Sequence, residues 1–173
     1  SIHPGTWASL QSQRGRLPHA LLLVGQRGLG KFALAQAFAK SLLCEQPLDG
    51  GLFCGECLAC NWFEHDNHPD FRLLQPQAMV EEGEVDGGRK KASQQITIDH
   101  VRALDSFFSV GTHRAGVKII VVNPADAMNR NTANALLKSL EEPAPGTVFL
   151  MVSSEPLRLL PTIRSRCQVV PVA

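Results

Sequence analysis

The sequence predicts an α/β fold in which a parallel sheet of about five strands is flanked by helices. Apolar runs alternate with helical patterns along the 173 residues, and this alternation is typical of βαβ units. A glycine-rich loop also lies directly between a buried strand and a helix, as phosphate-binding loops do. The length and the 44% of hydrophobic residues are ordinary for one domain with a real core. We therefore expect a single domain over residues 1–173.

Five short apolar runs are the expected strands, at residues 20–24, 70–74, 117–122, 147–152 and 168–170. Helices are expected over residues 30–43, 99–108 and 131–142, because apolar residues recur there at intervals of three and four. Asp99 is the expected cap of the second helix, and Pro143 ends the third. Residues 75–95 are polar, with an acidic run before a basic one, and we expect a flexible loop there.

Composition excludes several classes of protein. The net charge is +1, so the chain is not a polycation built to coat nucleic acid, and any contact with DNA is expected to be local or indirect. No run approaches the roughly 18 apolar residues of a membrane span, and the first residues lack the features of a secretory signal. We therefore expect a cytoplasmic location and no membrane partner. The absence of an initial Met and the apolar end QVVPV suggest that both ends were cut from a longer chain.

The stretch GQRGLGKF, residues 25–32, matches a phosphate-binding loop except at its last position. Gly25, Gly28 and Gly30 allow successive N–H groups to point inward, and Lys31 is placed to meet a phosphate. The pattern next requires Ser or Thr, whose hydroxyl holds magnesium, and Phe32 offers no oxygen. We predict a vestigial loop at which weak nucleotide binding remains open. The alternative for Lys31 is a solvated side chain beside an empty loop.

A second nucleotide motif is also defective. The strand at 117–122 runs into Asn123 and Pro124, where hydrolysis would require an Asp-Glu pair for the metal and the water. Two separate strands have thus lost groups that serve the same ion. This predicts that ATP with magnesium is not hydrolysed. The alternative is that Asp126 supplies the carboxylate, which needs a turn or a helix that redirects Asp126 to the tip of this strand.

A cysteine cluster follows the loop helix. Its members are Cys44, Cys54, Cys57 and Cys60. Four thiolates from a helix end and a tight loop suit tetrahedral, structural zinc, and we expect a zinc module at about residues 44–66. Disulfides are a poor alternative in a cytosolic α/β protein, whereas an iron–sulfur cluster and metal-free thiols stay open. His65 and His68 lie near enough to be considered, but four cysteines complete the shell. Cys167 is expected to be an ordinary buried thiol.

Four motifs together resemble the bacterial clamp-loader subunits of DNA polymerase III. They are HALLLVG at 19–25, the four-cysteine insertion directly behind the loop helix, NALLKSLEEP at 134–143 and SRC at 165–167. The resemblance covers essentially the whole chain. Because the nucleotide motifs are defective, the chain is most similar to the delta prime members and less so to the ATP-hydrolysing gamma/tau members.

The resemblance implies an AAA+ nucleotide-binding-type module in a five-subunit loader that opens the sliding clamp and places it on primed DNA. Gamma/tau and delta subunits would be its partners in a hetero-oligomer, and the full chain would continue into a helical lid domain and a collar. The alternative is an active gamma/tau-like ATPase motor.

In that family the Arg of the SRC motif projects into the ATP site of the neighbouring subunit, which here designates Arg166. The alternative for Arg166 is a surface arginine paired with Glu155. Within NALLKSLEEP the leucines are expected in the core, while Lys138 and Glu141 lie on the polar side, available to a neighbour.

Overall fold

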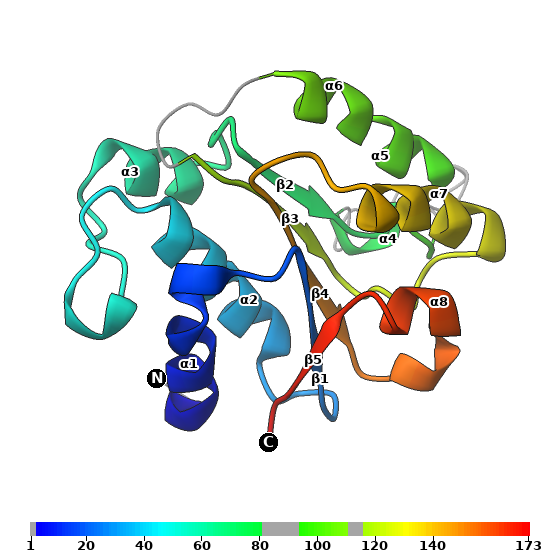
Figure 1. Cartoon of the computed structure of the whole chain (residues 1–173), viewed down its shortest axis with the longest axis horizontal. Helices are drawn as coiled ribbons and strands as arrows, with labels where there is room; N and C mark the ends of the chain where they lie inside the picture. The colour runs from blue at the N-terminus through cyan, green and yellow to red at the C-terminus, as the bar shows by residue number, and fades with distance from the viewer. Residues whose placement is uncertain (1–2, 81–93, 111–115) are drawn as a thin grey trace, which may run out of the picture.

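The computed structural model describes residues 3–80, 94–110 and 116–173, and its centre is a parallel sheet of five strands in the order β2-β3-β4-β1-β5 (Figure 1). The strands are β1 (Ala20–Val24), β2 (Phe71–Leu74), β3 (Lys118–Val122), β4 (Thr147–Ser153) and β5 (Gln168–Pro171). All four neighbouring pairs are parallel. The predicted fold class is confirmed.

Helices cover both faces of this sheet (Figure 1). One face carries α1 (Pro4–Ser12) and α2 (Lys31–Leu43); the other carries α5 (Ile98–Arg102), α6 (Leu104–Ser109), α7 (Arg130–Glu141) and α8 (Pro161–Arg164). Shorter elements complete the described chain: η1 (Arg14–Arg16), η2 (Asp49–Gly51), α3 (Leu58–Glu64), α4 (Gln77–Val80) and η3 (Pro156–Arg158). No helix among the described residues is long and apolar enough to cross a membrane.

Alternate residues of each central strand enter two separate cores. Leu21 and Leu23 pack with Phe38 of α2 on one face, whereas Leu22 packs with Leu136 of α7 on the other. Strands buried on both faces read as continuous apolar runs, which is why KIIVV and TVFLMV could be recognised without alternation. The sheet therefore holds its strand ends in fixed positions, and these ends anchor the loops that follow them.

The structure corrects two local predictions. The helix expected at 99–108 forms as α5 and α6, and it begins at Ile98, so Asp99 lies inside the first turn and is not the cap. Thr97 caps α5 instead: its hydroxyl accepts from the N–H of His100, whose ring accepts from the N–H of Thr97. The loop expected at 75–95 contains the short helix α4, and residues 81–93 lie outside the described part.

Candidate functional site

The glycine loop lies at the carboxyl end of β1, which is flanked by β4 on one side and β5 on the other. A Cβ on Gly25 would come within 2.4 Å of the carbonyl oxygen of Val172, so only glycine lets the chain after β5 pass this close. Gly28 and Gly30 have φ of +84° and +78°, values that favour glycine. The curled backbone expected of a phosphate loop is therefore present.

The side chain of Lys31 turns back onto its own loop. Its ammonium donates to the carbonyl oxygens of Gly25 at 2.8 Å and Gln26 at 2.6 Å, and the residue is 5% exposed. Burial lowers the pKa of Lys31 and the Arg27 guanidinium lowers it further, while Asp126 acts in the opposite direction. The solvated alternative for Lys31 is wrong, because loop carbonyls take the place of water around its charge.

The two defective motif positions have structural roles of their own. The ring of Phe32 packs against the core beneath α1 and α2. Asn123 is buried at the end of β3, and its N–H donates to the carbonyl oxygen of Leu74 at 2.9 Å. Neither position supplies a carboxylate or a hydroxyl to a magnesium ion.

Asp126 contacts the tip of β4, the neighbour of β3, whereas the alternative for the missing carboxylate concerned the tip of β3 itself. The hydroxyl of Ser153, the last residue of β4, donates to Asp126 Oδ1 at 2.6 Å. The carboxylate also acts electrostatically on Lys31. Sequence reasoning did not find this pair, because no motif marks a serine and an aspartate that are 27 positions apart.

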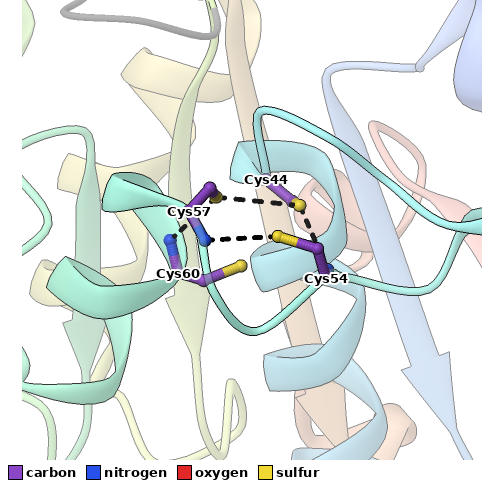
Figure 2. Close-up of side chains that lie close together, drawn as sticks. All are labelled: Cys44, Cys54, Cys57 and Cys60. Carbon is purple, nitrogen blue, oxygen red and sulfur yellow. Dashed lines mark hydrogen bonds between the residues drawn. The ribbon is translucent and has the colours of Figure 1, made fainter.

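The four cysteines come together between the end of α2 and α3 (Figure 2). All four Sγ atoms lie within 4.8 Å of one another, and those of Cys44 and Cys57 are 3.9 Å apart. One tetrahedral ion with sulfur ligands at ~2.3 Å would place them about 3.8 Å apart. A multi-iron cluster needs wider spacing, because its irons and sulfides lie between the thiolates. The geometry therefore fits a single metal ion.

Backbone N–H groups point at these sulfurs. Those of Cys54, Cys57 and Cys60 donate to the preceding cysteine of the cluster at 3.3 to 3.4 Å, and the N–H of Glu45 approaches Cys57 Sγ at 3.5 Å. Burial opposes ionisation of Cys57, yet the N–H groups of Glu45 and Cys60 and the neighbouring thiols lower the pKa of Cys57 to about 7. Burial raises the pKa of Cys60 to about 12. The donors are arranged to stabilise thiolates, the form that binds metal.

Among the residues that the structure describes, the two histidines considered as metal ligands do not belong to the four-cysteine cluster. His65 is exposed, and its Nδ1 lies 2.8 Å from the carbonyl oxygen of Asn61. His68 is buried, and its Nδ1 accepts from the N–H of Asp70 at 3.0 Å. Burial raises the pKa of Cys167 to about 12. Cys167 is only partly buried, so the expectation of a buried thiol is met in part, and its Sγ donates to the carbonyl oxygen of Ile163 at 3.2 Å.

Arg166 lies between α8 and β5, and its side chain is 49% exposed. Its guanidinium is 3.7 Å from Glu141 at the end of α7. The alternative pairing with Glu155 is wrong, since that carboxylate lies 2.9 Å from Arg158 and 3.9 Å from Arg27. Lys138 is exposed on the same helix as Glu141. The partner of Arg166 was missed because α7 and α8 meet only through tertiary packing.

The sheet order and the curled loop together define a P-loop module of AAA+ type. A DNA polymerase III gamma subunit-related protein from Thermotoga maritima superposes with a TM-score of 0.68 at 21% identity, covering 97% of this chain and 46% of that one. The RuvB protein of Thermotoga maritima gives a TM-score of 0.52 at 14% identity, over 96% of this chain and 42% of that one. These likenesses establish the fold.

The family model described as DNA polymerase III, delta subunit, matches residues 3–173, and the chain belongs to this family. Relatives named DNA polymerase III subunit delta' are 44% identical in Pseudomonas aeruginosa, 39% in Bacillus subtilis and 36% in Escherichia coli, over 93%, 92% and 94% of this chain. The chain spans only 43 to 44% of the length of those relatives.

Proposed function

We propose that the chain is the AAA+ module of a non-hydrolysing clamp-loader subunit of DNA polymerase III, which supplies Arg166 in trans to ATP bound by a gamma/tau-like neighbour. Together with a delta subunit, such an assembly opens the sliding clamp and places it on primed DNA. Family membership supports the assignment, and the position of Arg166 relative to the chain's own loop is the observation that carries the arginine's role.

The register of the sheet separates Arg166 from the loop. Gln168 pairs with Leu21 in parallel strands, so Arg166 lies at the level of residue 19, whereas the loop begins at Gly25 beyond the other end of β1. Six residues at a rise of roughly 3.3 Å correspond to about 20 Å. No arginine side chain spans that distance. If Arg166 contacts a nucleotide, that nucleotide must therefore be bound by another subunit.

The ion pair between Arg166 and Glu141 is weak enough for Arg166 to leave it and contact a partner subunit. An ion pair between half-exposed side chains contributes about 1 kcal/mol or less, so it can orient the guanidinium and still release it. Arginine fits the task because it stays charged and presents several donors in a rigid fork that matches phosphate oxygens.

The cysteine cluster is proposed to hold structural zinc. Four thiolates around one ion form a closed shell, which leaves no position for water or substrate. Zinc there would fix the segment after α2 against α3. The natural chain is proposed to continue into lid and collar domains, and the assembly is proposed to work in the cytoplasm.

Assembly is tested by mixing the full protein with purified gamma/tau and delta subunits on a size-exclusion column. We expect the three to elute together as one complex, earlier than any of them alone. Elution of the protein at its own position, with gamma/tau and delta unaffected, would contradict membership of the loader.

The purified protein should show no magnesium-dependent ATP turnover above background, because Phe32 and Asn123 offer the metal no ligands. Phe32→Thr alone should not restore turnover, since position 123 still lacks a carboxylate. Phosphate release is the measurement, with a gamma/tau subunit as the positive control. Robust hydrolysis would favour the motor alternative, and its loss in Asp126→Asn would identify Asp126 as the substitute carboxylate.

A further inference from the structure

The sheet ends in two edge strands, β2 and β5, and its two open edges differ (Figure 1). In a parallel sheet, alternate residues of an edge strand turn their backbone N–H and C=O groups toward the neighbouring strand, and the residues between them turn these groups outward. An open edge can pair with another chain, so natural proteins block such edges with prolines, charges or covering segments. The proposed function gives no role to the edge at β2.

The edge at β5 is blocked by a proline. The N–H of Val172 donates to the carbonyl oxygen of Val24 in β1 at 2.7 Å. By alternation, Val169 and Pro171 are the residues of β5 whose backbone groups turn outward. Proline has no N–H, so Pro171 removes a donor that an added strand would need.

The edge at β2 keeps its donors. The carbonyl oxygen of Asp70 accepts from the N–H of Ile119 at 2.9 Å. The carbonyl oxygen of Leu74 accepts from the N–H of Asn123, also at 2.9 Å. The even-numbered residues of this strand therefore face β3, and the odd-numbered residues turn their backbone groups outward.

The outward groups of Phe71 are satisfied within the chain. Its N–H donates to the carbonyl oxygen of His68 at 3.3 Å, and its C=O accepts from the guanidinium of Arg72 at 2.7 Å. Leu73 and Gln75 differ from Phe71. In the part of the chain that the structure describes, no group pairs with the N–H or C=O of Leu73 or with the N–H of Gln75. The available part of the edge is therefore short and centred on Leu73.

A groove of about 590 Å³ lies beside this part of the edge, because Leu73 and Gln75 both line it. Phe63 of α3 and Phe71 form an aromatic wall, with ring centroids 4.8 Å apart. Gln36 of α2 forms part of the opposite wall, and among the described residues its buried Oε1 has no hydrogen-bond partner. An occupant that lets this amide turn outward would supply the missing hydrogen bond.

The charged side chains of the groove are one of each sign, Asp66 and Arg72. The guanidinium of Arg72 is turned onto the strand edge and lies 4.5 Å from the ring of Phe107 on the other face of the sheet. The other polar walls are amides and one imidazole: Gln36, Asn67, His68 and Gln75. Such a groove favours an uncharged occupant, and it lacks the basic cluster that nucleic acid or anionic lipid requires.

We propose that the edge of β2 at Leu73 and Gln75 binds an extended, uncharged segment of a partner protein by strand addition. In antiparallel register, the residue opposite Leu73 accepts from the N–H of Leu73 and donates to its C=O. The side chain of that residue lies on the same face of the sheet as the side chain of Leu73, so it enters the groove. Asn or Gln suits this position, because its amide can hydrogen-bond with Gln36 while the aromatic wall packs on its stem.

This edge is separate from the surface that carries Arg166. β2 and β5 are the opposite edges of the sheet, and Arg166 directly precedes the segment of β5. A neighbour engaged by Arg166 therefore leaves the edge of β2 free, and the two roles can fail independently.

The occupant is identified with a photo-crosslinking residue at position 75 of the full protein within the assembled polymerase complex, and position 169 on β5 is the control. We expect position 75 to cross-link to an uncharged segment of another protein that contains Asn or Gln. Cross-links only to the protein's own chain or to a second copy, or none at all, would overturn the proposal while leaving the role of Arg166 intact.

Strand addition is tested with a fluorescein-labelled synthetic peptide of the cross-linked segment, whose binding to the full protein is followed by fluorescence anisotropy. Two twins of this peptide carry N-methyl groups on alternate backbone nitrogens, so that one twin loses the donors that face Leu73 and the other loses the donors that face away. We expect the first twin to bind at least about tenfold more weakly and the second to bind like the parent peptide. Equal binding by the two twins would contradict strand addition.

Variants test the same contact from the side of the protein. Leu73→Pro removes the outward N–H and should weaken peptide binding about tenfold; Val169→Pro, at an outward position of β5, is its matched control. Gln36→Leu should weaken binding of the peptide but not of its analogue with Leu in place of the Asn or Gln, and it does not depend on how β2 tolerates proline. Arg166→Ala should leave peptide binding unchanged. Equal weakening by Val169→Pro, or no effect of both Leu73→Pro and Gln36→Leu, would overturn the proposal.

Discussion

Arg166→Ala should join the loader normally and yet weaken its DNA- and clamp-stimulated ATP hydrolysis. An arginine supplied in trans stabilises charge on the transferred phosphoryl group and is worth roughly 10³ to 10⁵ in rate, or about 4 to 7 kcal/mol of transition-state stabilisation. The proposed loader has several ATP sites, so total turnover should fall by less than this factor. Phosphate release and clamp loading onto primed DNA are the measurements, with assembly checked by size exclusion.

Two further variants distinguish a specific role of the Arg166 guanidinium in trans from a general effect of losing one positive charge. Arg166→Lys should rescue poorly, because a point charge cannot reproduce the guanidinium fork. Glu141→Gln removes only the ion pair at 3.7 Å, and it should change the rate much less than Arg166→Ala; Glu142→Gln is its matched control. If Arg166→Ala loads clamps at the wild-type rate, Arg166 is a surface residue and the module's role is architectural.

Cys57→Ser should abolish the metal content of the protein and loosen the zinc module. Structural zinc contributes on the order of 10 kcal/mol because binding is coupled to local folding. The loss should remain largely local, since Phe63 is the one residue of the module among the hydrophobic residues that form or pack against the two cores. Elemental analysis should find about one zinc in the wild-type protein and nearly none in the variant, and hydrogen exchange should rise in residues 44–66.

Cys167→Ser is the control for this experiment, because it removes the one cysteine outside the cluster. It should keep the full metal content and the thermal stability of the wild type to within about 1 kcal/mol. Visible absorbance typical of an iron–sulfur cluster, or a wild-type protein purified without metal, would contradict structural zinc.

The fold was predictable because its strands are buried on both faces. Runs such as Ala20–Val24 and Lys118–Val122 are apolar throughout, so they stand out against the helices between them. Exact helix limits were harder to predict, because Thr97 and Asp99 are both residue types that cap helices, and the reciprocal hydrogen bonds of Thr97 with His100 mark the start of α5. The cluster of four cysteines was predictable from spacing alone, since a tight loop leaves the thiols few other arrangements.

The finer details of the site depend on tertiary contacts that no local pattern encodes. Lys31 has the same place in the motif whether its ammonium faces an anion or its own loop. The partners of Arg166 and Asp126 are Glu141 and Ser153, which come from elements brought together only when the sheet forms. Sequence thus indicated which residues carry charge, and the fold determined which of them meet.

The packing of Phe32 against the core bears on how easily such a module could be converted into an active ATPase. Placing a hydroxyl there by Phe32→Thr would remove a ring that its neighbours enclose in part, at a cost of at most about 3 kcal/mol. That cost would come before any gain, because a metal ligand at position 32 is useless until position 123 also changes. Under the proposed function, neither substitution alone would restore turnover, and Phe32→Thr would also lower the free energy of unfolding because it removes packing from the core.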